Sequence, residues 1–245
     1  MLDSLRSLEL ATIATGSSIG YYTSQKPKLL KDFDKTFGKY GRKTLAQHYG
    51  DDLGGQIVIE TRREYEALIP QIPNVGGKEN PNEMALIQGT WALALYRVLK
   101  SRGKTADETG RVFYEGAEAM LRSIPGPLRY IAGRWQFRRS NMNKLKKQAS
   151  ESQKRLYPDD WVWSFVQGDG KEFDWGLDNT ECGVVKFFHA QGTDELVPYM
   201  CRLDFAMSKA MDMGLDRTTT LAEGGEKCDF RFKRGRESKQ DSRSR

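Results

Sequence analysis

The spacing of apolar residues changes once along the chain, close to Pro158, and this change limits the fold more than any other feature. Up to residue 156, apolar side chains recur every three or four residues, as they do on one face of an α-helix. After Pro158 the pattern shifts to alternation and to short aromatic and β-branched runs, which favour strands. The sequence therefore predicts an α+β fold, in which a helical N-terminal layer is followed by a small antiparallel sheet with packed helices.

Proline and glycine divide the first part of the chain into segments. A helix is expected over residues 27–48, with a break near Gly38 and Gly41, and a short helix is expected over 60–69. The stretch 72–81 is rich in Pro, Gly and Asn, and this composition is typical of a loop. We therefore expect a helical unit that ends in an irregular connection.

Further helices are expected after this loop. The first begins at Asn82, a residue type that often caps helices, and ends at Gly103. Thr105 and Glu108 have the spacing of a capping box and predict the start of the next helix. A Pro-Gly-Pro break then separates it from residues 128–156, which predict one or two helices with a basic outer face.

The part of the chain after Pro158 predicts a hairpin, two helices and two more strands. The hairpin is indicated by two strand-like runs on either side of a Gly-Asp-Gly turn. Gly224 and Gly225 are expected to form the turn between the last two strands. The expected elements are strands 161–166 and 172–177, helices 183–191 and 193–213, and strands 218–221 and 228–232.

We expect a single continuous domain over residues 26–233. Its helical region covers 26–156, and its cysteine-containing α+β region covers 157–233. Residues 1–25 are treated as an N-terminal segment. Residues 234–245 are polar and basic and have no apolar side chain to bury, so they are expected to form a disordered tail.

Composition narrows the cellular setting. The chain has no run of about 20 apolar residues, so no membrane span is predicted. Its N-terminus lacks the pattern of a secretory signal, and its three cysteines are an odd number. Disulfides persist mainly in oxidising compartments. We therefore expect a cytoplasmic protein with three free thiols.

The net charge of +6 raises the question of a nucleic-acid partner. The basic residues gather at 134–147 and in the tail, and a run of charge is most often a solvated helix face. Nucleic acid is therefore not the expected partner. We expect a small-molecule substrate and no membrane partner, and a homo-oligomer stays open.

All three cysteines lie in the last part of the chain, close to other reactive side chains. Cys182 follows an expected strand and opens an expected helix, where unpaired N–H groups and the helix dipole lower a thiol pKa. His189 lies about two turns further on, and Asp204 shares a helix face with Cys201. With Cys228, this set supplies nucleophiles, a titratable base and a carboxylate.

Two other interpretations of the cysteines stay open. Cysteine is a small apolar residue that is often buried, so the three thiols could simply belong to a core with Phe187, Phe188 and Leu203. A zinc site is the less favoured alternative, because no pair of cysteines has the short C-x₂-C spacing. We therefore expect no cofactor.

Several motifs after Pro158 are more specific than composition. An aromatic hairpin is followed by a Glu-Cys pair and a Phe-Phe pair, and then by Glu-Leu-Val-Pro-Tyr-Met-Cys-Arg-Leu-Asp at 195–204. The most specific block is Arg-Thr-Thr-Thr-Leu-Ala-Glu-Gly-Gly at 217–225, with Cys-Asp-Phe-Arg-Phe at 228–232. With these motifs, the chain resembles the L-2-amino-thiazoline-4-carboxylic acid hydrolase family. Gly183 stands where this resemblance leads us to expect a proline.

The resemblance implies a hydrolase that opens a small heterocyclic ring of the 2-amino-thiazoline-4-carboxylate kind. Cleavage of a C–N or C–S bond would give a carbamoyl-cysteine-type product. The ring carbon between nitrogen and sulfur is an amidine-like electrophile that a thiolate or activated water can attack. We expect Cys182 to be the nucleophile, and His189 and Asp204 to carry the proton transfers.

The remaining candidates are assigned to substrate binding. Arg217 would hold the substrate carboxylate with its planar guanidinium, and Thr220 would donate a hydrogen bond to developing charge. Cys201 and Cys228 would line the pocket or complete a metal site. The alternative is a non-catalytic small-molecule or metal-binding domain of the same fold.

Overall fold

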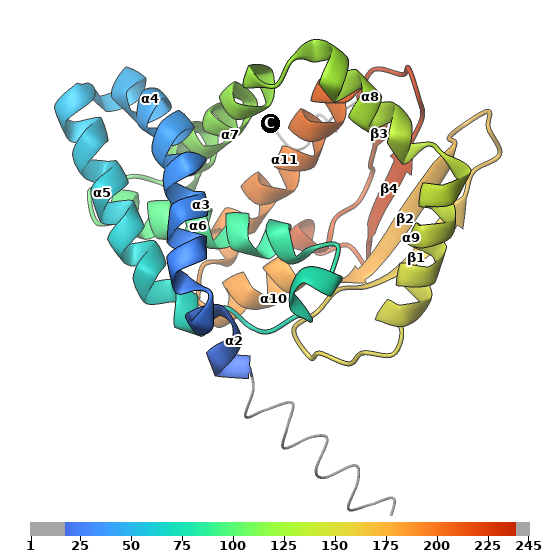
Figure 1. The fold of residues 1–245 in the computed structure, drawn as a ribbon, viewed down its shortest axis with the longest axis horizontal. Helices are drawn as coiled ribbons and strands as arrows, with labels where there is room; N and C mark the ends of the chain where they lie inside the picture. The colour runs from blue at the N-terminus through green and yellow to red at the C-terminus, as the bar shows by residue number, and fades with distance from the viewer. Residues whose placement is uncertain (1–17, 239–245) are drawn as a thin grey trace, which may run out of the picture.

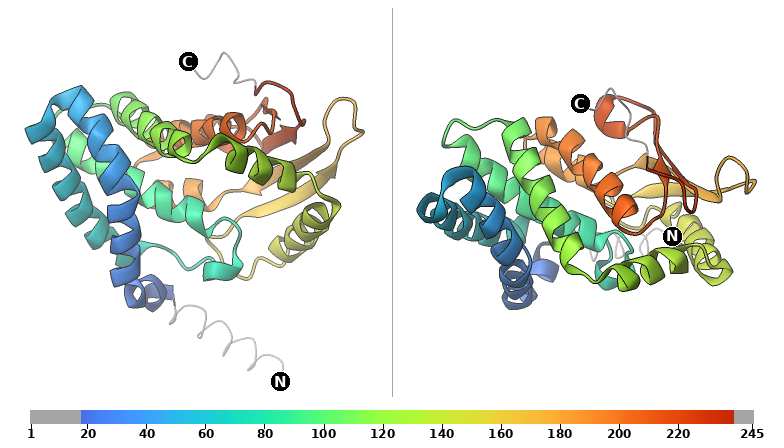
Figure 2. Two further views of the ribbon diagram at one scale, coloured as in Figure 1. Left: turned by 45° about the horizontal axis from the view of Figure 1, so that its top comes forward. Right: turned by 90° about the horizontal axis from the view of Figure 1, so that it is seen from above.

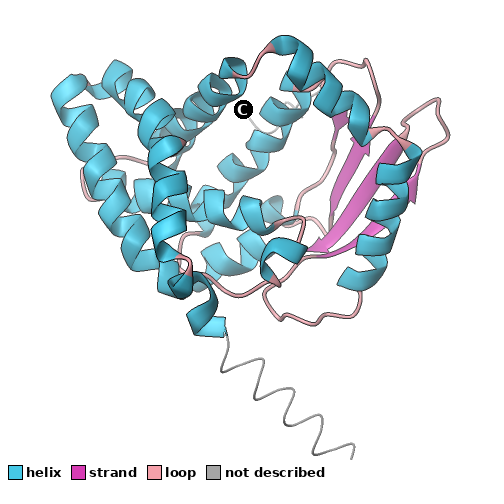
Figure 3. Cartoon of the chain, in the orientation of Figure 1, coloured by secondary structure: helices cyan, strands magenta, loops and turns pink. Residues whose placement is uncertain are grey.

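The computed structural model describes residues 18–238 and confirms the α+β class (Figures 1 and 3). Within these residues the chain is helical up to residue 152, and the strands follow residue 161. The helices before the sheet are α2 (Ser18–Ser24), α3 (Lys26–Lys35), α4 (Phe37–Tyr49), α5 (Asp51–Leu68), α6 (Glu83–Lys100), α7 (Ala106–Ser123), α8 (Gly126–Gln136) and α9 (Arg139–Ser152).

The sheet and its helices form the other part of the molecule. Its four strands are antiparallel, in the order β1-β2-β4-β3. In Figure 1, α3, α4 and α5 lie at the left and the sheet lies at the right, with α6, α10 and α11 between them. The elements of this part are β1 (Val162–Gln167), β2 (Trp175–Glu181), α10 (Gly183–Ala190), α11 (Val197–Ala210), β3 (Leu215–Asp216) and β4 (Cys228–Phe232).

The main apolar core joins the two regions. Helix α6 is buried on almost every side, and its residues Trp91 and Leu95 lie inside this core. Trp163 of β1 and Phe188 of α10 belong to the same apolar cluster. A sheet and a helical layer that share one core bury their apolar faces against each other.

Local sequence signals account for several helix boundaries. The capping box is confirmed, because the Thr105 hydroxyl accepts from the Glu108 N–H at 3.1 Å and the Thr105 N–H donates to the Glu108 carboxylate at 2.9 Å. The break before α8 is also confirmed, and the one or two helices expected over 128–156 are two, α8 and α9. Asn82 does precede α6, but its side chain makes no capping hydrogen bond.

Two helix predictions were wrong in their boundaries. The break between α3 and α4 lies at Thr36, and Gly38 and Gly41 are inside α4. Helix α5 begins at Asp51 rather than at residue 60. Gly54 lies inside this helix and is part of the contact between α4 and α5. A Cβ atom at Gly54 would lie 2.7 Å from the backbone nitrogen of Ala46. The glycine that weakens the helical pattern therefore permits the close helix crossing.

This contact predicts opposite effects for two neighbouring glycines. Gly54→Ala should lower the free energy of unfolding by about 2 kcal/mol, because backbone atoms must move to admit the methyl group. Gly55→Ala meets only the Arg42 side chain, at 3.6 Å, and should raise stability by up to about 1 kcal/mol through helix propensity. Urea unfolding of both variants checks this. Equal effects of the two substitutions would contradict it.

The hairpin and the two helices after it are present, but β2 runs from Trp175 to Glu181 instead of over 172–177, and α11 begins at Val197 after a 3₁₀ turn. One strand prediction was wrong. The stretch 218–221 forms no strand, and β4 pairs instead with β2 and with the short β3. The Asp229 carboxylate accepts the backbone N–H groups of Thr218 and Thr219 at 2.9 and 2.8 Å. These side-chain bonds replace the ladder of a strand, and a 3₁₀ turn then begins at Leu221.

The chain ends are described only in part. Of the expected N-terminal segment, residues 18–24 form α2, and residues 1–17 lie outside the described residues. Of the expected tail, residues 234–238 are described, and the Ser238 hydroxyl bonds the Ser208 hydroxyl at 3.0 Å. Residues 239–245 lie outside the described range. No helix between residues 18 and 238 is long and apolar enough to cross a membrane.

Candidate functional site

Cys182 lies between a strand and a helix, as the sequence predicts. It follows β2 directly and occupies the N-cap position of α10 in an extended conformation. Gly183 explains how the helix can start there. A Cβ atom at this position would lie 2.7 Å from both the Asp159 carbonyl oxygen and the Trp161 ring. The glycine found in place of the expected proline lets α10 begin tightly against the chain that enters β1.

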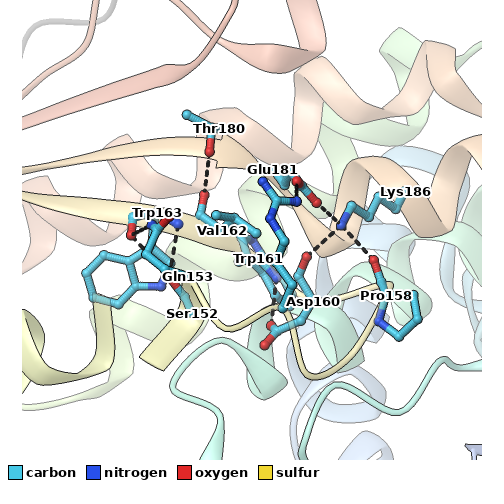
Figure 4. A network of polar contacts seen from close by, with 11 residues as sticks. Ser152, Gln153, Pro158, Asp160, Trp161, Val162, Trp163, Thr180, Glu181 and Lys186 are labelled. Atoms are coloured by element: carbon cyan, nitrogen blue, oxygen red, sulfur yellow. Dashed lines mark hydrogen bonds and ion pairs between the residues drawn. The ribbon is translucent and has the colours of Figure 1, made fainter. Parts of the chain in front are cut away.

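A polar network fixes this corner of the fold (Figure 4). Glu181, next to Cys182, forms ion pairs with Arg155 and Lys186. The Lys186 ammonium also donates to the carbonyl oxygens of Pro158 and Asp160, at 2.7 and 2.9 Å. The network therefore ties α10 to the connection before β1 and holds the Cys182 backbone in place.

Helix α11 contributes a carboxylate with a buried partner. Arg217, which is 4% exposed, donates to the Asp204 carboxylate at 2.7 Å and to the Cys201 carbonyl at 2.8 Å. Its guanidinium lies between the rings of Phe205 and Phe230, about 5 Å from each centroid (5.0 and 4.9 Å). This arrangement fixes the direction of Arg217 and, through it, one oxygen of Asp204.

The three thiols and Asp204 come together at one place. All three cysteines are free, and Cys228 is buried at the start of β4, where its sulfur accepts the Leu221 N–H at 3.2 Å. Electrostatic interactions with Cys182, Cys228 and Asp204 each raise the pKa of Cys201. Those with Cys228 and Asp204 also raise the pKa of Cys182. The structure therefore groups these side chains from α10, α11 and β4.

Burial reverses the thiol acidity expected from the sequence. It raises the pKa of Cys182 to about 11, and the helix-start N–H groups of Val184 and Val185 only partly offset it. Burial also raises the pKa of Cys201 well above its ordinary value, and that of Cys228 in the same direction. The expectation of a thiolate near neutrality was wrong, because desolvation outweighs the helix terminus.

The Asp204 carboxylate is partly exposed, although protein surrounds much of it. Its side chain keeps 42% exposure, yet desolvation by the surrounding protein is the largest cause of its raised pKa. The Arg217 charge and hydrogen bond lower the pKa but do not cancel this effect. Only Oδ2 of the carboxylate is bonded to Arg217, and within residues 18–238 no partner of Oδ1 is found. One carboxylate oxygen is therefore free to accept from a ligand.

An apolar pocket lies against the helix that carries this carboxylate. Its cavity volume is about 80 Å³, it is partly open to solvent, and its aromatic walls include Phe37, Trp91 and Phe113. Leu203 and Met207 of α11 also line it. Met207 follows Asp204 by three residues, so the two side chains share one helix face. The pocket wall and the carboxylate are therefore neighbours along α11, although Asp204 is not itself part of the wall.

The part of the chain that holds this site matches a known protein family. A family model described as L-2-amino-thiazoline-4-carboxylic acid hydrolase matches residues 84–232, which is more than half of the chain. This chain belongs to the L-2-amino-thiazoline-4-carboxylic acid hydrolase family. No curated protein and no solved structure matches it. The matched residues extend from α6 to β4 and include Cys182, Cys201, Asp204 and Cys228.

Two residues assigned from the sequence do not reach the site of this thiazoline hydrolase family member. His189 is 79% exposed and bonds Asp194 at 3.0 Å on the surface. Helical spacing from Cys182 misplaced it, because an N-cap residue does not have helical backbone angles. Thr220 is buried, and its hydroxyl donates to the Glu223 carboxylate at 2.7 Å, within the turn that precedes β4.

The role expected of Arg217 also changes in this family member. Its two terminal nitrogens are already bonded to Asp204 and Cys201, so the described guanidinium does not present a fork to a substrate carboxylate. The apolar pocket was missed for a different reason. Its walls come from helices far apart in sequence, and no local motif marks such a surface. Within residues 18–238, no group of three or more His, Cys, Asp or Glu is arranged to hold a metal ion.

The raised pKa of Cys182 predicts slow alkylation near neutral pH. A group with a pKa of about 11 is a protonated thiol at pH 8, and its thiolate fraction grows only as the pH approaches 11. Iodoacetamide should therefore modify Cys182 about tenfold or more slowly than free cysteine at pH 8. Peptide mass spectrometry at several pH values measures this rate. A half-maximal rate near pH 8 would contradict the prediction.

Proposed function

We propose that this family member hydrolyses a small ring containing a cyclic amidine, such as a 2-amino-thiazoline-4-carboxylate, to a carbamoyl-cysteine-type product. Membership of the family supports hydrolase chemistry in general. The substrate class is our proposal, and one observation carries it: Asp204 has one oxygen fixed by Arg217 and the other free, beside two half-buried thiols.

The free oxygen of Asp204 suits an amidine. A cyclic amidine presents N–H donors and carries positive charge when protonated, and a carboxylate accepts charge-assisted hydrogen bonds from such a group. Arg217 acts as a positioning residue in this proposal, because it holds the other oxygen and the orientation of the carboxylate. Thr220 stabilises the turn before β4 rather than contacting the substrate.

Cys182 is the proposed nucleophile, and Asp204 is the proposed base. The Cys182 thiol transfers its proton to Asp204, whose burial raises its pKa and makes it a stronger base than an exposed aspartate. The thiolate then attacks the amidine carbon. Cys201 and Cys228 form the wall beside the attacked carbon.

Ring opening and hydrolysis complete the reaction. The tetrahedral adduct expels either the ring sulfur or the ring nitrogen, which takes the proton from Asp204. Water then attacks the carbon that stays attached to Cys182 and releases the thiol. Loss of sulfur gives an N-carbamoyl product with a free thiol, whereas loss of nitrogen gives an S-carbamoyl product. Thiolate is the better leaving group at neutral pH, so we favour C–S cleavage.

A second candidate function is binding of the same small molecule without turnover. It is favoured by the pKa of about 11 at Cys182, because the resting protein then holds a thiol and not a thiolate. In this alternative Asp204 still binds the amidine, and no covalent bond forms. The two candidates differ only in whether product appears.

Incubation with 2-amino-thiazoline-4-carboxylate tests both candidates. The expected result is a product heavier by one water, with one new thiol for each ring opened. Thiazolidine-4-carboxylate has no amidine carbon and serves as the control compound that should stay intact. Binding measured by calorimetry without any product would support the second candidate. Neither binding nor product would reject both candidates for this ring.

The apolar pocket predicts the substrate range. A ring that carries a benzyl group on its exocyclic nitrogen should bind about tenfold or more tightly than the unsubstituted ring, because the group leaves water for the aromatic walls. Ala117→Leu fills the pocket and should remove this advantage without weakening the unsubstituted ring. Ala67→Leu, on the exposed side of α5, is the matched control. Calorimetry compares the dissociation constants, and equal values for the two rings would count against the pocket.

A further inference from the structure

Helix α8 presents an apolar stripe to the outside of the molecule. The buried residue of α8 is Gly133, which lies against Met211 at the end of α11. Leu128, Ile131 and Trp135 are 57%, 62% and 45% exposed, and their spacing of three and four residues places them on one face. By helical periodicity this face is opposite Gly133. Figure 2 shows α8 along the outer edge of the molecule in its right-hand view.

The chain around this apolar stripe carries only positive charge. Between Glu118 and Glu151 the sequence contains no acidic residue. Within the described part of the chain, Arg122 is the member of this basic group that forms an ion pair, with Glu118. The basic residues of the segment are Arg122, Arg129, Arg134, Arg138, Arg139, Lys144, Lys146 and Lys147.

Apolar exposure and positive charge together favour one kind of partner. A second copy of the chain would bring like charges together, which costs energy. Nucleic-acid phosphates would attract the basic side chains but would give no reason for exposed Leu128 and Ile131. The surface of an anionic bilayer binds both kinds of side chain, because the head groups attract Arg and Lys and the acyl boundary accepts apolar side chains.

We propose that α8 and the start of α9 bind the surface of an anionic lipid bilayer, with the apolar stripe inserted among the head groups. Such contact lies at the bilayer surface and needs no membrane-spanning helix. The proposal does not depend on the ring-opening activity, because the apolar stripe lies on the face of α8 turned away from α11.

Vesicle sedimentation with the full chain tests the proposal. The protein should sediment with phosphatidylcholine vesicles that contain about one-third phosphatidylserine, and not with pure phosphatidylcholine. Added salt should release it, because screening weakens the charge attraction. Trp135 gives an independent signal, since the other four tryptophans are buried. Its emission should shift to the blue and resist acrylamide quenching when the vesicles are anionic.

Matched variants separate the two contributions. A triple change of Leu128, Ile131 and Trp135 to Ser should weaken vesicle binding about tenfold or more, as should changing the four arginines of 129–139 to Gln. Ile59→Ser removes an equally exposed apolar residue on α5, and it should bind like the unchanged protein.

Three results would overturn the proposal. They are no sedimentation with anionic vesicles, binding that neither set of changes weakens, and tight binding of duplex DNA or RNA by a protein that ignores vesicles. Circular dichroism checks the fold of each variant. If the triple variant does not fold, the arginine variant and the Trp135 signal decide the question.

Discussion

Replacement of Cys182 by Ser should lower kcat by about two to four orders of magnitude while the fold is retained. Serine nearly matches cysteine in size, but its hydroxyl is a much poorer nucleophile at neutral pH. Cys182 is also held at the start of α10 by a network that does not use its sulfur. Steady-state kinetics with the thiazoline substrate measure the loss, and circular dichroism checks the fold.

Cys201→Ser is the matched control for this experiment. Cys201 is another half-buried thiol of the same site, with a pKa raised by burial, but we assign it to the wall and expect less than about a tenfold change. Mass spectrometry of the quenched reaction should find an adduct on Cys182 in the unchanged protein. Full activity of Cys182→Ser would remove the covalent mechanism and leave water activated by Asp204.

Replacement of Asp204 by Asn should damage both activity and stability. The substitution leaves the Arg217 charge buried with only a carbonyl oxygen and a neutral amide beside it, which should cost about 3 kcal/mol of unfolding free energy. It also removes the proposed base, so kcat should fall by about two orders of magnitude or more. Urea unfolding and steady-state kinetics measure the two effects.

An exposed pair of the same type provides the control. Asp34 and Arg62 form a two-bond ion pair on the surface, at 2.8 and 3.2 Å, and Asp34→Asn should cost no more than about 1 kcal/mol. Arg217→Met tests positioning separately. Loss of the guanidinium removes the main influence that lowers the pKa of Asp204, so the acid limb of kcat/KM should move to higher pH. If the acid limb of the kcat/KM profile stayed at the same pH, the assigned role of Asp204 would be contradicted.

The parts of the fold that local signals determine were predictable. The change of period near Pro158, the hairpin and the Thr105 capping box each depend on residues close in sequence. The start of α5 and the stretch 218–221 were not predictable in this way. Gly54 is explained by a contact with α4, and the Asp229 carboxylate takes the N–H groups that a strand partner would otherwise accept.

The same distinction applies to the site. The motifs of the family resemblance grouped Cys182, Cys201, Asp204 and Cys228, which the structure brings close together. Spacing alone left open that these cysteines only fill a core. It failed for the acidity of the thiols, because desolvation depends on all the surrounding protein and not on the neighbouring residues. It also failed for His189, because Cys182 is the extended N-cap residue of α10 and helical spacing does not apply from it.

The apolar pocket is built partly from chain outside the family match. Thr36, Phe37 and Tyr40 of its wall precede residue 84, whereas the thiols and Asp204 follow residue 181. Reaction chemistry and substrate selection would therefore be encoded in separate stretches of one polypeptide. Sequence drift in the N-terminal helices could then alter which molecules are accepted while the reacting groups stay the same. A chimaera that exchanges only α3 and α4 between two family members is the natural way to transfer substrate preference.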